Sequence, residues 1–205
     1  ISFSTKIGKA CYIPIGHTKG NNLEEKKVIN KIKPVLEDKS IKKIGQNIKF
    51  DYTIFFHRGV IMNSMEDTML MSYVLDAGKN RHNMDVLSEI HLDHKTIAFK
   101  DIVGTGKKQI NFSEVKIDIA KDYASEDADI TFRLYKIFSK NIKLEKLLNI
   151  YEVFEKPLIK ILALMEIYGV KVDQKFLQLL SKKFEKKINN LEKEIYKITK
   201  KEFKI

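Results

Sequence analysis

The sequence predicts an α/β domain that continues into a long helical arm. Segments that alternate apolar and polar residues open the chain, and helical patterns then alternate with short β-branched segments, which together indicate the α/β domain. Beyond about residue 141 the pattern becomes purely helical and rich in lysine, which indicates the arm. The apolar fraction of 43% over 205 residues is enough to bury a core.

Two strands and a helix are predicted first. Ile1–Lys6 and Ala10–Ile15 alternate apolar residues with polar or small ones on either side of a glycine, as the strands of a hairpin do. Leu23–Leu36 has apolar residues at helical spacing, and its first turn holds Glu24 and Glu25, whose charges suit the positive end of a helix dipole. We therefore expect a hairpin followed by an amphipathic helix.

The next predicted elements are a short strand and a helix, with an aspartate at their junction. Ile41–Gly45 is short and β-branched, and Phe50–Arg58 is bulky and apolar until Gly59 stops it. Strand, turn and helix are expected in that order. Asp51 would then lie where the strand passes into the helix. Two short helices, Thr68–Leu75 and Met84–His91, should follow, capped at their N-termini by Asp67 and Asn83.

The region between residues 94 and 142 is predicted as a loop followed by a long helix. His94–Phe112 is polar, contains two glycines and lacks sustained periodicity, so we expect one short helix there at most. Its basic stretch Gly104–Lys108 lacks the spacing and the following hydroxyl of a phosphate-binding loop. Ile117–Ile142 returns to a helical pattern, and the acidic run Tyr123–Asp129 lies inside it.

The arm is predicted as two long helices with a break at Tyr168–Asp173. In the second helix, apolar residues from Phe176 to Ile198 form a stripe with charged residues between them. Such a stripe packs on a partner helix or on a further domain. Since the chain also starts without Met, at the beginning of a strand, we expect it to be a fragment.

The charge indicates a polyanionic partner. The formal net charge is +11 and the pI is near 9.4, and lysines that neutralise phosphates gain free energy by releasing counterions. An AT-rich coding sequence whose lysines only solvate helix faces explains the charge equally well. A single cysteine, Cys11, excludes an internal disulfide framework, and no apolar run could span a bilayer. A cytoplasmic protein without membrane contacts is expected.

Two acidic sites far apart in the sequence carry the predicted chemistry. Residues four apart on a helix share a face, so Tyr123 and Asp127 address one point while Glu126 and Asp129 diverge from it. A carboxylate can ligate Mg²⁺ or Mn²⁺ and a phenol can orient water, so these two residues with Asp51 suit metal-assisted hydrolysis of a phosphodiester. A solvated acidic face and an N-capping aspartate are the commoner roles. Nuclease chemistry requires Asp51 and Asp127 to meet in one pocket.

Six segments of the chain resemble one family. Gly45–Asp51 and Tyr123–Asp129 resemble the second and third exonuclease motifs of the proofreading domain in bacterial DNA polymerase I. The similarity covers nearly the whole chain. In the order and spacing of that family it continues through Asp67–Leu70, Arg81–Asp85, His94–Phe99 and Tyr168–Asp173.

The resemblance implies a ribonuclease-H-like fold, a mixed sheet flanked by helices, and the removal of nucleotides one at a time from a DNA 3′ end. It also implies two divalent ions, Mg²⁺ or Mn²⁺, roughly 4 Å apart, one of which activates water while the other stabilises the leaving 3′-oxygen. By position, Asp127 would ligate the first metal, Asp51 would hold the second partly through water, and Tyr123 would position the nucleophile.

The resemblance further implies a contact surface for a frayed single strand. Gln46, Asn47, Arg81 and Phe99 match family positions that contact this strand, and amides and flat side chains suit a sequence-tolerant grip. Phe50 is assigned to the same DNA-binding group. It stands where relatives often have Tyr, so it lacks one hydroxyl near the substrate but keeps the ring. The alternatives are turn formation for Gln46 and Asn47, a surface ion pair for Arg81 and a core position for Phe99.

One family motif is not found among these 205 residues. It is the first exonuclease motif, an Asp-x-Glu on a strand before the hairpin, and without it the first metal loses most of its ligands. We therefore expect little or no nuclease activity from the isolated fragment. The resemblance assigns residues 1–142 to the exonuclease domain without its first strand, and residues 143–205 to the helical start of a polymerase domain that leads to the thumb.

Three functions remain open. The resemblance favours a proofreading 3′–5′ exodeoxyribonuclease, a monomer in a bacterial cytoplasm whose partners are a single-stranded 3′ DNA end and the rest of the polymerase chain. A scaffold or DNA-binding module on the same fold is the second, which the presence of Asp51, Tyr123 and Asp127 disfavours. The third is a stand-alone 3′ exoribonuclease resembling ribonuclease D, which the thumb-like arm disfavours.

Overall fold

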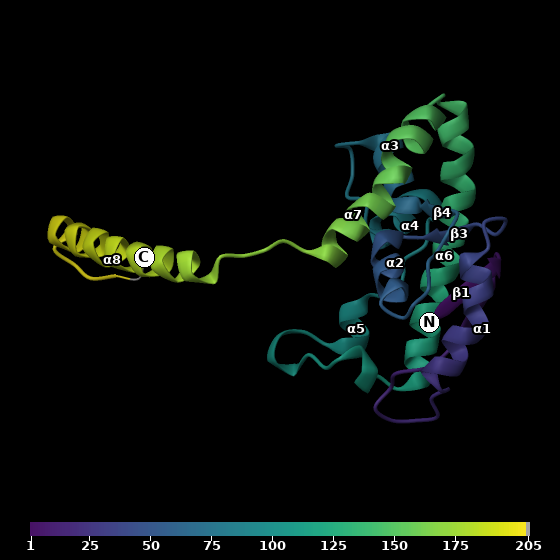
Figure 1. The fold of residues 1–205 in the computed structure, drawn as a ribbon, viewed down its shortest axis with the longest axis horizontal. Coiled ribbons are helices and arrows are strands. Elements are labelled where there is room, and N and C mark those ends of the chain that lie inside the picture. The colour runs from purple at the N-terminus through teal and green to yellow at the C-terminus, as the bar shows by residue number, and fades with distance from the viewer. Residues whose placement is uncertain (204–205) are drawn as a thin grey trace. The chain divides into compact units, whose positions relative to one another are not determined.

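Strands and helices alternate along the first part of the chain, and helices alone make up the rest (Figure 1). This computed structural model describes residues 1–203. Its strands are β1 (Ser2–Lys6), β2 (Lys9–Tyr12), β3 (Lys43–Gly45) and β4 (Met65–Asp67). Its α-helices are α1 (Glu25–Glu37), α2 (Ile48–Phe56), α3 (Thr68–Asp76), α4 (Met84–Leu92), α5 (Phe99–Val103), α6 (Ile117–Leu144), α7 (Lys156–Tyr168) and α8 (Gln174–Thr199). Two compact units result, one spanning Ile1–Ile167 and the other beginning at Tyr168.

The N-terminal hairpin is antiparallel and packs on α6. β1 and β2 pair with Phe3 opposite Cys11, and the turn between them holds Gly8 at φ +73°, a left-handed value that favours glycine. The Gly8 N–H donates to Asp129 Oδ1 at 2.6 Å, and Asp129 Oδ2 pairs with Arg133. The predicted hairpin is confirmed, and one carboxylate of the acidic run serves to anchor it.

β3 and β4 form a parallel pair, with Gly45 opposite Asp67 and α2 between them in the chain. Antiparallel and parallel pairings both occur, as the predicted mixed sheet requires, and they lie in two separate two-stranded ladders. β4 was not predicted from the sequence. Two of its three residues, Glu66 and Asp67, are acidic, and hydrogen bonds that include partners far along the chain compensate for their burial.

Asp67 fixes the start of two helices. Its carboxylate accepts two backbone N–H groups of α3 at 2.9 and 3.4 Å, and the N–H groups of Asn47 and Ile48 at the start of α2 at 3.0 and 2.9 Å. Burial raises the pKa of this carboxyl group although the four N–H groups act in the opposite direction. The N-cap predicted for α3 is confirmed. Asn83 precedes α4 as predicted, but its side chain makes no capping hydrogen bond.

α6 is the central helix of the first unit. It packs on the hairpin, β3, α3, α4 and α5. Its buried residues Ile130, Leu134 and Phe138 form a core with Met71 of α3 and Leu87 of α4. The long helix predicted around the acidic run is confirmed, as is the loop region before it with its one short α-helix, α5.

Part of the helical region after residue 143 belongs to the first unit. A π-helical turn, Ile150–Glu155, buries Tyr151, whose hydroxyl donates to Glu66 Oε2 and accepts the N–H of Asp67, both at 3.0 Å. Ile159 of α7 is buried in a core with residues of α1 and α2. The compact unit therefore extends through almost all of α7, and a domain boundary at residue 142 stays a prediction.

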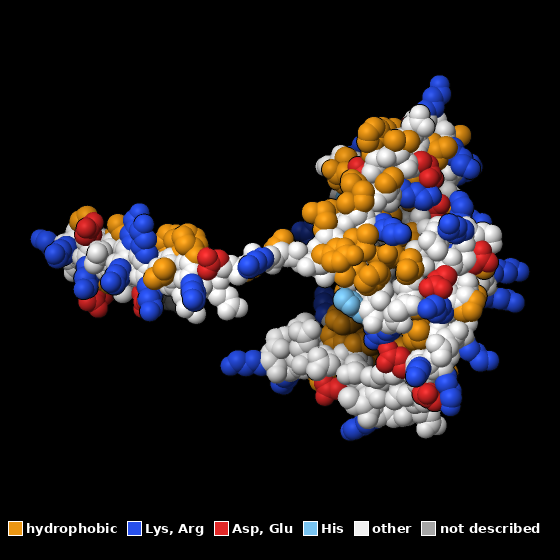
Figure 2. All heavy atoms as spheres, viewed as in Figure 1, with side chains coloured by type: hydrophobic (Ala, Val, Ile, Leu, Met, Phe, Trp, Pro, Cys, Tyr) orange, Lys and Arg blue, Asp and Glu red, His pale blue; other side chains and the backbone are white. Residues whose placement is uncertain are grey.

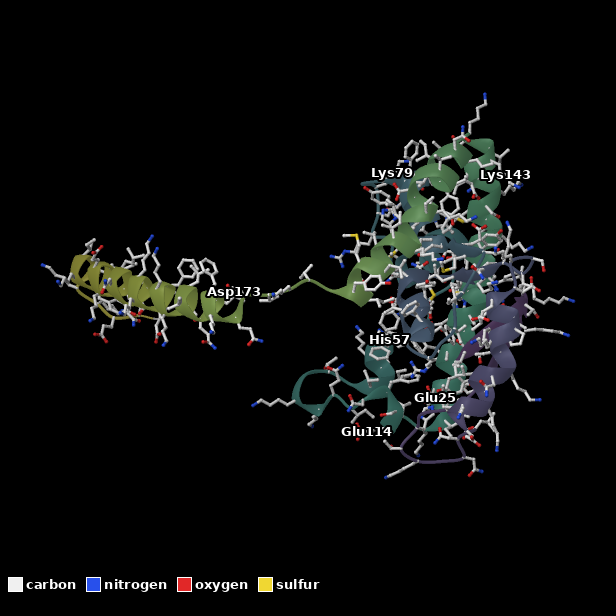
Figure 3. All side chains as sticks on the ribbon, viewed as in Figure 1. Glu25, His57, Lys79, Glu114, Lys143 and Asp173 are labelled. Carbon is white, nitrogen blue, oxygen red and sulfur yellow. The ribbon has the colours of Figure 1, made fainter. Side chains whose placement is uncertain are left out.

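The second unit consists of α8 and the segment that precedes it. Asp173, labelled in Figure 3, caps α8 by accepting the Phe176 N–H at 2.9 Å. None of the residues of α8 is buried, and its predicted apolar stripe lines a shallow groove with Leu180, Phe184 and Ile188. Among residues 1–203 no helix has both the length and the apolar character needed to cross a membrane.

Candidate active site

Tyr123 and Asp127 lie one turn apart on one face of α6, and each side chain is close enough to shift the pKa of the other. One carboxylate oxygen of this pair has no hydrogen-bond partner in the described part of the chain. Asp127 Oδ1 is buried and has no hydrogen-bond partner within residues 1–203. A buried carboxylate oxygen is costly unless a cation or a donor meets it, so this atom fits a divalent metal ion.

Burial shifts the pKa values of both side chains. For Asp127 burial is the main cause and the charges on Glu126 and Asp85 add to it, so the pKa rises to about 6 although the nearby Tyr123 hydroxyl acts in the opposite direction. For Tyr123 burial again comes first, followed by the charge on Asp127, and its pKa lies far above the usual range. The phenol therefore stays protonated at neutral pH and serves as a hydrogen-bond donor.

Asp51 lies in the first turn of α2, and the N-capping role considered for it is wrong. Asn47 occupies the N-cap position, with φ +58°. The Asp51 side chain is exposed, yet the protein around it removes enough water to raise its pKa to about 6, and the charge on Asp67 adds to the rise. The meeting of Asp51 with Asp127 in one pocket stays a prediction.

Glu126, the neighbour of Asp127, holds the loop before α5 instead of facing the site. Its Oε1 lies 2.8 Å from His94 Nε2, and its Oε2 accepts the Ile97 N–H at 2.7 Å. Asp85 of α4 accepts a threonine hydroxyl of the same loop at 2.7 Å. Glu126 therefore diverges from Asp127, as the helical spacing predicted. Asp85 was missed, because nothing in its spacing relates α4 to the acidic run.

Phe99, Phe112 and Tyr123 form a group of three rings, here called the aromatic cluster. The rings of Phe99 and Phe112 stack with centroids 6.1 Å apart and an interplanar angle of 17°. Tyr123 lies 5.9 Å from Phe99 and 6.0 Å from Phe112, again between ring centroids. Phe99 exposes 46% of its surface, so it is not a core residue and its ring can take a base by stacking. Phe112 was missed, because it is a lone aromatic residue in a polar loop.

The remaining predicted DNA contacts lie around the start of α2. The Gln46 amide is engaged at both ends, since its Nε2 donates to the His82 carbonyl at 2.8 Å and its Oε1 accepts a threonine hydroxyl of α3. This supports its turn-forming role and ties the loop that carries Arg81 to the start of α2. Asn47, Phe50 and Arg81 are exposed. Arg81 makes no salt bridge within residues 1–203, so the surface ion pair considered for it is not formed there.

The carboxylates described so far do not build a complete metal site. In the part of the chain that the structure describes, no three His, Cys, Asp or Glu side chains gather closely enough to hold a metal. Mg²⁺ and Mn²⁺ prefer oxygen ligands and keep several waters, so Asp127 and Asp51 could each supply one ligand. Further ligands would have to come from other residues or from substrate phosphate.

The raised pKa values predict that the metal-free protein gains stability as the pH falls from 7.5 to 5. A carboxyl group whose pKa is about 6 in the folded protein and 3.8 in the unfolded chain takes up a proton at a higher pH when the protein is folded. Its contribution to the free energy of unfolding therefore increases as the pH falls through about 6. Asp127→Asn should therefore show a smaller gain than the wild type in urea unfolding at the two pH values with EDTA. Asp38→Asn is the control, because the pKa of Asp38 is lowered and it stays charged throughout. Equal gains in wild type and Asp127→Asn would contradict the prediction.

Comparisons with known proteins assign the family. A family model described as 3′–5′ exonuclease matches residues 1–143. A DNA polymerase I from Rhizobium leguminosarum is 40% identical over 98% of this chain, and one from Pseudomonas aeruginosa is 36% identical over 100% of it. The chain spans only 21% and 23% of the length of these two relatives.

Solved structures share the fold. The POL domain of Pol1 from M. smegmatis, in complex with a DNA primer-template and dNTP, has a TM-score of 0.67 at 18% identity and covers 90% of this chain and 29% of that one. A nuclease in its apo form has a TM-score of 0.64 at 16% identity and covers 84% of this chain and 78% of that one. At these identities the likeness supports the predicted α/β fold alone. Since the family model matches well over half of its residues, the chain belongs to the 3′–5′ exonuclease family and is a homologue of bacterial DNA polymerase I.

Proposed function

We propose that the chain is most of the proofreading domain of a bacterial DNA polymerase I. In this proposal the intact domain hydrolyses the 3′-terminal phosphodiester of single-stranded DNA and releases nucleoside monophosphates. The observation that carries the proposal is the Tyr123–Asp127 pair, in which a phenol lies beside a carboxylate that keeps one buried oxygen without a partner in residues 1–203. The presence of this pair and of Asp51 argues against a scaffold that has lost its chemistry.

The substrate strand is held by stacking and by exposed polar groups. The half-exposed ring of Phe99 offers a face for a base next to Tyr123, so a terminal nucleotide would stack beside the Tyr123–Asp127 pair. Asn47, Phe50 and Arg81 are exposed and can reach sugar, base or phosphate. Gln46 shapes the turn that presents them, because both ends of its amide are engaged. These contacts tolerate any base sequence, as proofreading requires.

Tyr123 and the two aspartates have separate roles in the chemistry. Tyr123 remains protonated, so its hydroxyl orients a water molecule or a phosphate oxygen by donating a hydrogen bond and does not remove a proton. Asp127 and Asp51, with pKa values of about 6, are mostly ionised above pH 7 and would hold Mg²⁺ or Mn²⁺. Two such ions, when bound, supply activation of the water and stabilisation of the leaving 3′-oxygen.

The activity is expected from a longer polypeptide. The Asp-x-Glu motif of the family is not among these 205 residues, so we propose that they bind DNA but hydrolyse it slowly or not at all. We propose further that residues 143–205 lead into a polymerase domain of a monomeric, cytoplasmic protein. The span of 21% to 23% of the two relatives supports this, because it leaves room for such a domain.

The test is the digestion of a 5′-labelled single-stranded DNA by the full-length parent polypeptide. With Mg²⁺ we expect a ladder of products shortened one nucleotide at a time from the 3′ end, and with EDTA an intact strand. An RNA strand of the same sequence should remain largely intact. Faster digestion of the RNA would favour the exoribonuclease alternative, and digestion of neither strand in Mg²⁺ or Mn²⁺ would overturn the proposal.

A further inference from the structure

The loop formed by residues 104–111, here called the basic loop, has a fixed base. The Ile110 N–H donates to the Val103 carbonyl at 2.9 Å and closes the loop. Val103 is only 2% exposed and lies in a small core with Val115 and with Ala120 of α6. Figure 1 shows the loop, which follows α5, extending away from the helices of the first unit. The loop is therefore anchored at its base and open to solvent beyond it.

The aromatic cluster forms part of this base. Phe99 begins α5, the helix that leads into the loop, Phe112 directly follows the loop, and the two rings stack on each other. Both rings also contact Tyr123. A strand whose terminal base stacks on Phe99 would thus lie near the base of the basic loop, because Phe112 directly follows the loop.

The outer end of the basic loop is positively charged. Its two charged residues are Lys107 and Lys108, both exposed, and neither makes a salt bridge within residues 1–203. Glu114, labelled in Figure 3, follows the loop, but its carboxylate accepts the Asn111 N–H at 2.8 Å and so belongs to the base. Figure 2 shows blue lysine or arginine side chains at the outer end of this loop.

Two glycines allow the chain to turn so that both lysines lie at this end. Gly104 has φ +76° and Gly106 has φ +62°, both left-handed values that favour glycine. A Cβ atom on Gly104 would lie 3.3 Å from the Lys108 carbonyl oxygen, tighter than an ordinary contact. Gly106–Lys108 forms a single 3-10 turn, so the lysines occupy consecutive positions on it.

We propose that the basic loop binds the phosphate backbone of the single DNA strand whose 3′ end occupies the proposed active site. Lys107 and Lys108 neutralise phosphates upstream of the terminal nucleotide, while Phe99 stacks on a base. The inference rests on the proposed function, because it extends the grip on the same strand. Charge complementarity favours a nucleic acid strand, and the flexible point charge of lysine suits binding without sequence preference.

The experiment measures binding of a fluorescein-labelled dT12 strand to the 205-residue chain by anisotropy, in EDTA and from 50 to 200 mM NaCl. Each phosphate contact on a single strand contributes roughly 0.7 to the slope of log affinity against log salt. The double variant Lys107→Ala/Lys108→Ala should therefore lose about tenfold in affinity at 0.1 M salt, and its slope should be smaller by about 1.4. The matched control is Lys26→Ala/Lys31→Ala on α1, which removes two exposed lysines that form no salt bridge with a described residue and should bind as the wild type does.

Three other results would overturn the inference. If the loop variant keeps the wild-type affinity and slope while Phe99→Ala weakens binding, the loop assignment fails and the proposed function stands. The assignment also fails if the α1 control loses as much affinity as the loop variant, because charge alone would then explain the loss. If the wild type does not bind dT12 at all, the proposed function fails together with the inference. Equal urea stability of the variants shows that folding is not the cause.

Discussion

Asp127→Asn should reduce digestion of a 3′ single-stranded end by the parent polypeptide at least about a thousandfold, with Mg²⁺ present. A carboxylate that holds a catalytic metal stabilises developing charge by several kcal/mol, and ~4 kcal/mol corresponds to three orders of magnitude in rate. The amide has nearly the same shape as the carboxylate and its oxygen can accept a hydrogen bond from the Tyr123 hydroxyl, so the local packing should survive. Binding of the strand in EDTA should persist.

The measurement is a single-turnover digestion of a 5′-labelled strand, with folding checked by urea unfolding. We expect Asp127→Asn to be no less stable than the wild type at pH 7.5, because the variant no longer buries a charge that prefers water. Asp122→Asn is the matched control, since Asp122 lies on the same helix and is exposed, and within residues 1–203 its ion-pair partner is Lys121 alone. Undiminished digestion by Asp127→Asn would refute the role assigned to Asp127.

The elements that local sequence determines could be predicted. The hairpin follows from alternation around Gly8, α3 from the N-cap Asp67, and α6 from a helical pattern held over seven turns. β4 could not be predicted, because a three-residue strand with two acidic residues has no β pattern of its own. Its burial depends on Tyr151, which lies far along the chain and cannot be paired with Glu66 from spacing.

In the candidate site, too, some contacts could be predicted from the sequence and others could not. The proximity of Tyr123 and Asp127 could be predicted, because residues four apart on one helix share a face. The contact between Phe99 and Tyr123 could not be, since it depends on the path of an irregular loop that Glu126 fastens to α6. Phe112 carried no signal at all, because a single ring in a polar segment has no periodicity.

Tyr151 belongs to a buried polar cluster that links β4 to the helices after residue 143. Glu66 is only 2% exposed. Its carboxylate accepts hydrogen bonds from the Tyr151 hydroxyl at 3.0 Å and from Lys156 Nζ at 2.8 Å, and Lys42 Nζ lies 3.3 Å from Glu66 Oε1. Burial is the main cause of a strongly raised Tyr151 pKa, so this phenol remains a donor. The Glu66 carboxylate has lost its hydration, and the nearby cations and phenol compensate for that loss. The stability of the folded protein therefore depends on these partners.

Lys156→Met should lower the free energy of unfolding by about 2 kcal/mol at pH 7.5. Breaking a buried ion pair from one side costs roughly 3 to 5 kcal/mol, and the remaining partner Lys42 reduces that loss. Urea unfolding of the 205-residue chain, followed by tyrosine fluorescence, measures the change. Lys160→Met is the control, because this exposed lysine lies one turn further along α7 and makes no salt bridge with a described residue. It should shift the stability by less than about 0.5 kcal/mol.

Replacing both charged partners should restore the stability that Lys156→Met removes. In the double variant Glu66→Leu, Lys156→Met no buried charge is left without a partner, and the Tyr151 hydroxyl stays in place to accept the Asp67 N–H. Apolar packing of similar volume is often as stabilising as the ion pair, so we expect the stability of this variant to lie within about 1 kcal/mol of the wild type. A double variant less stable than Lys156→Met would mean that the polar contacts themselves, and not the avoidance of an unpaired charge, hold the π-helical turn on β4.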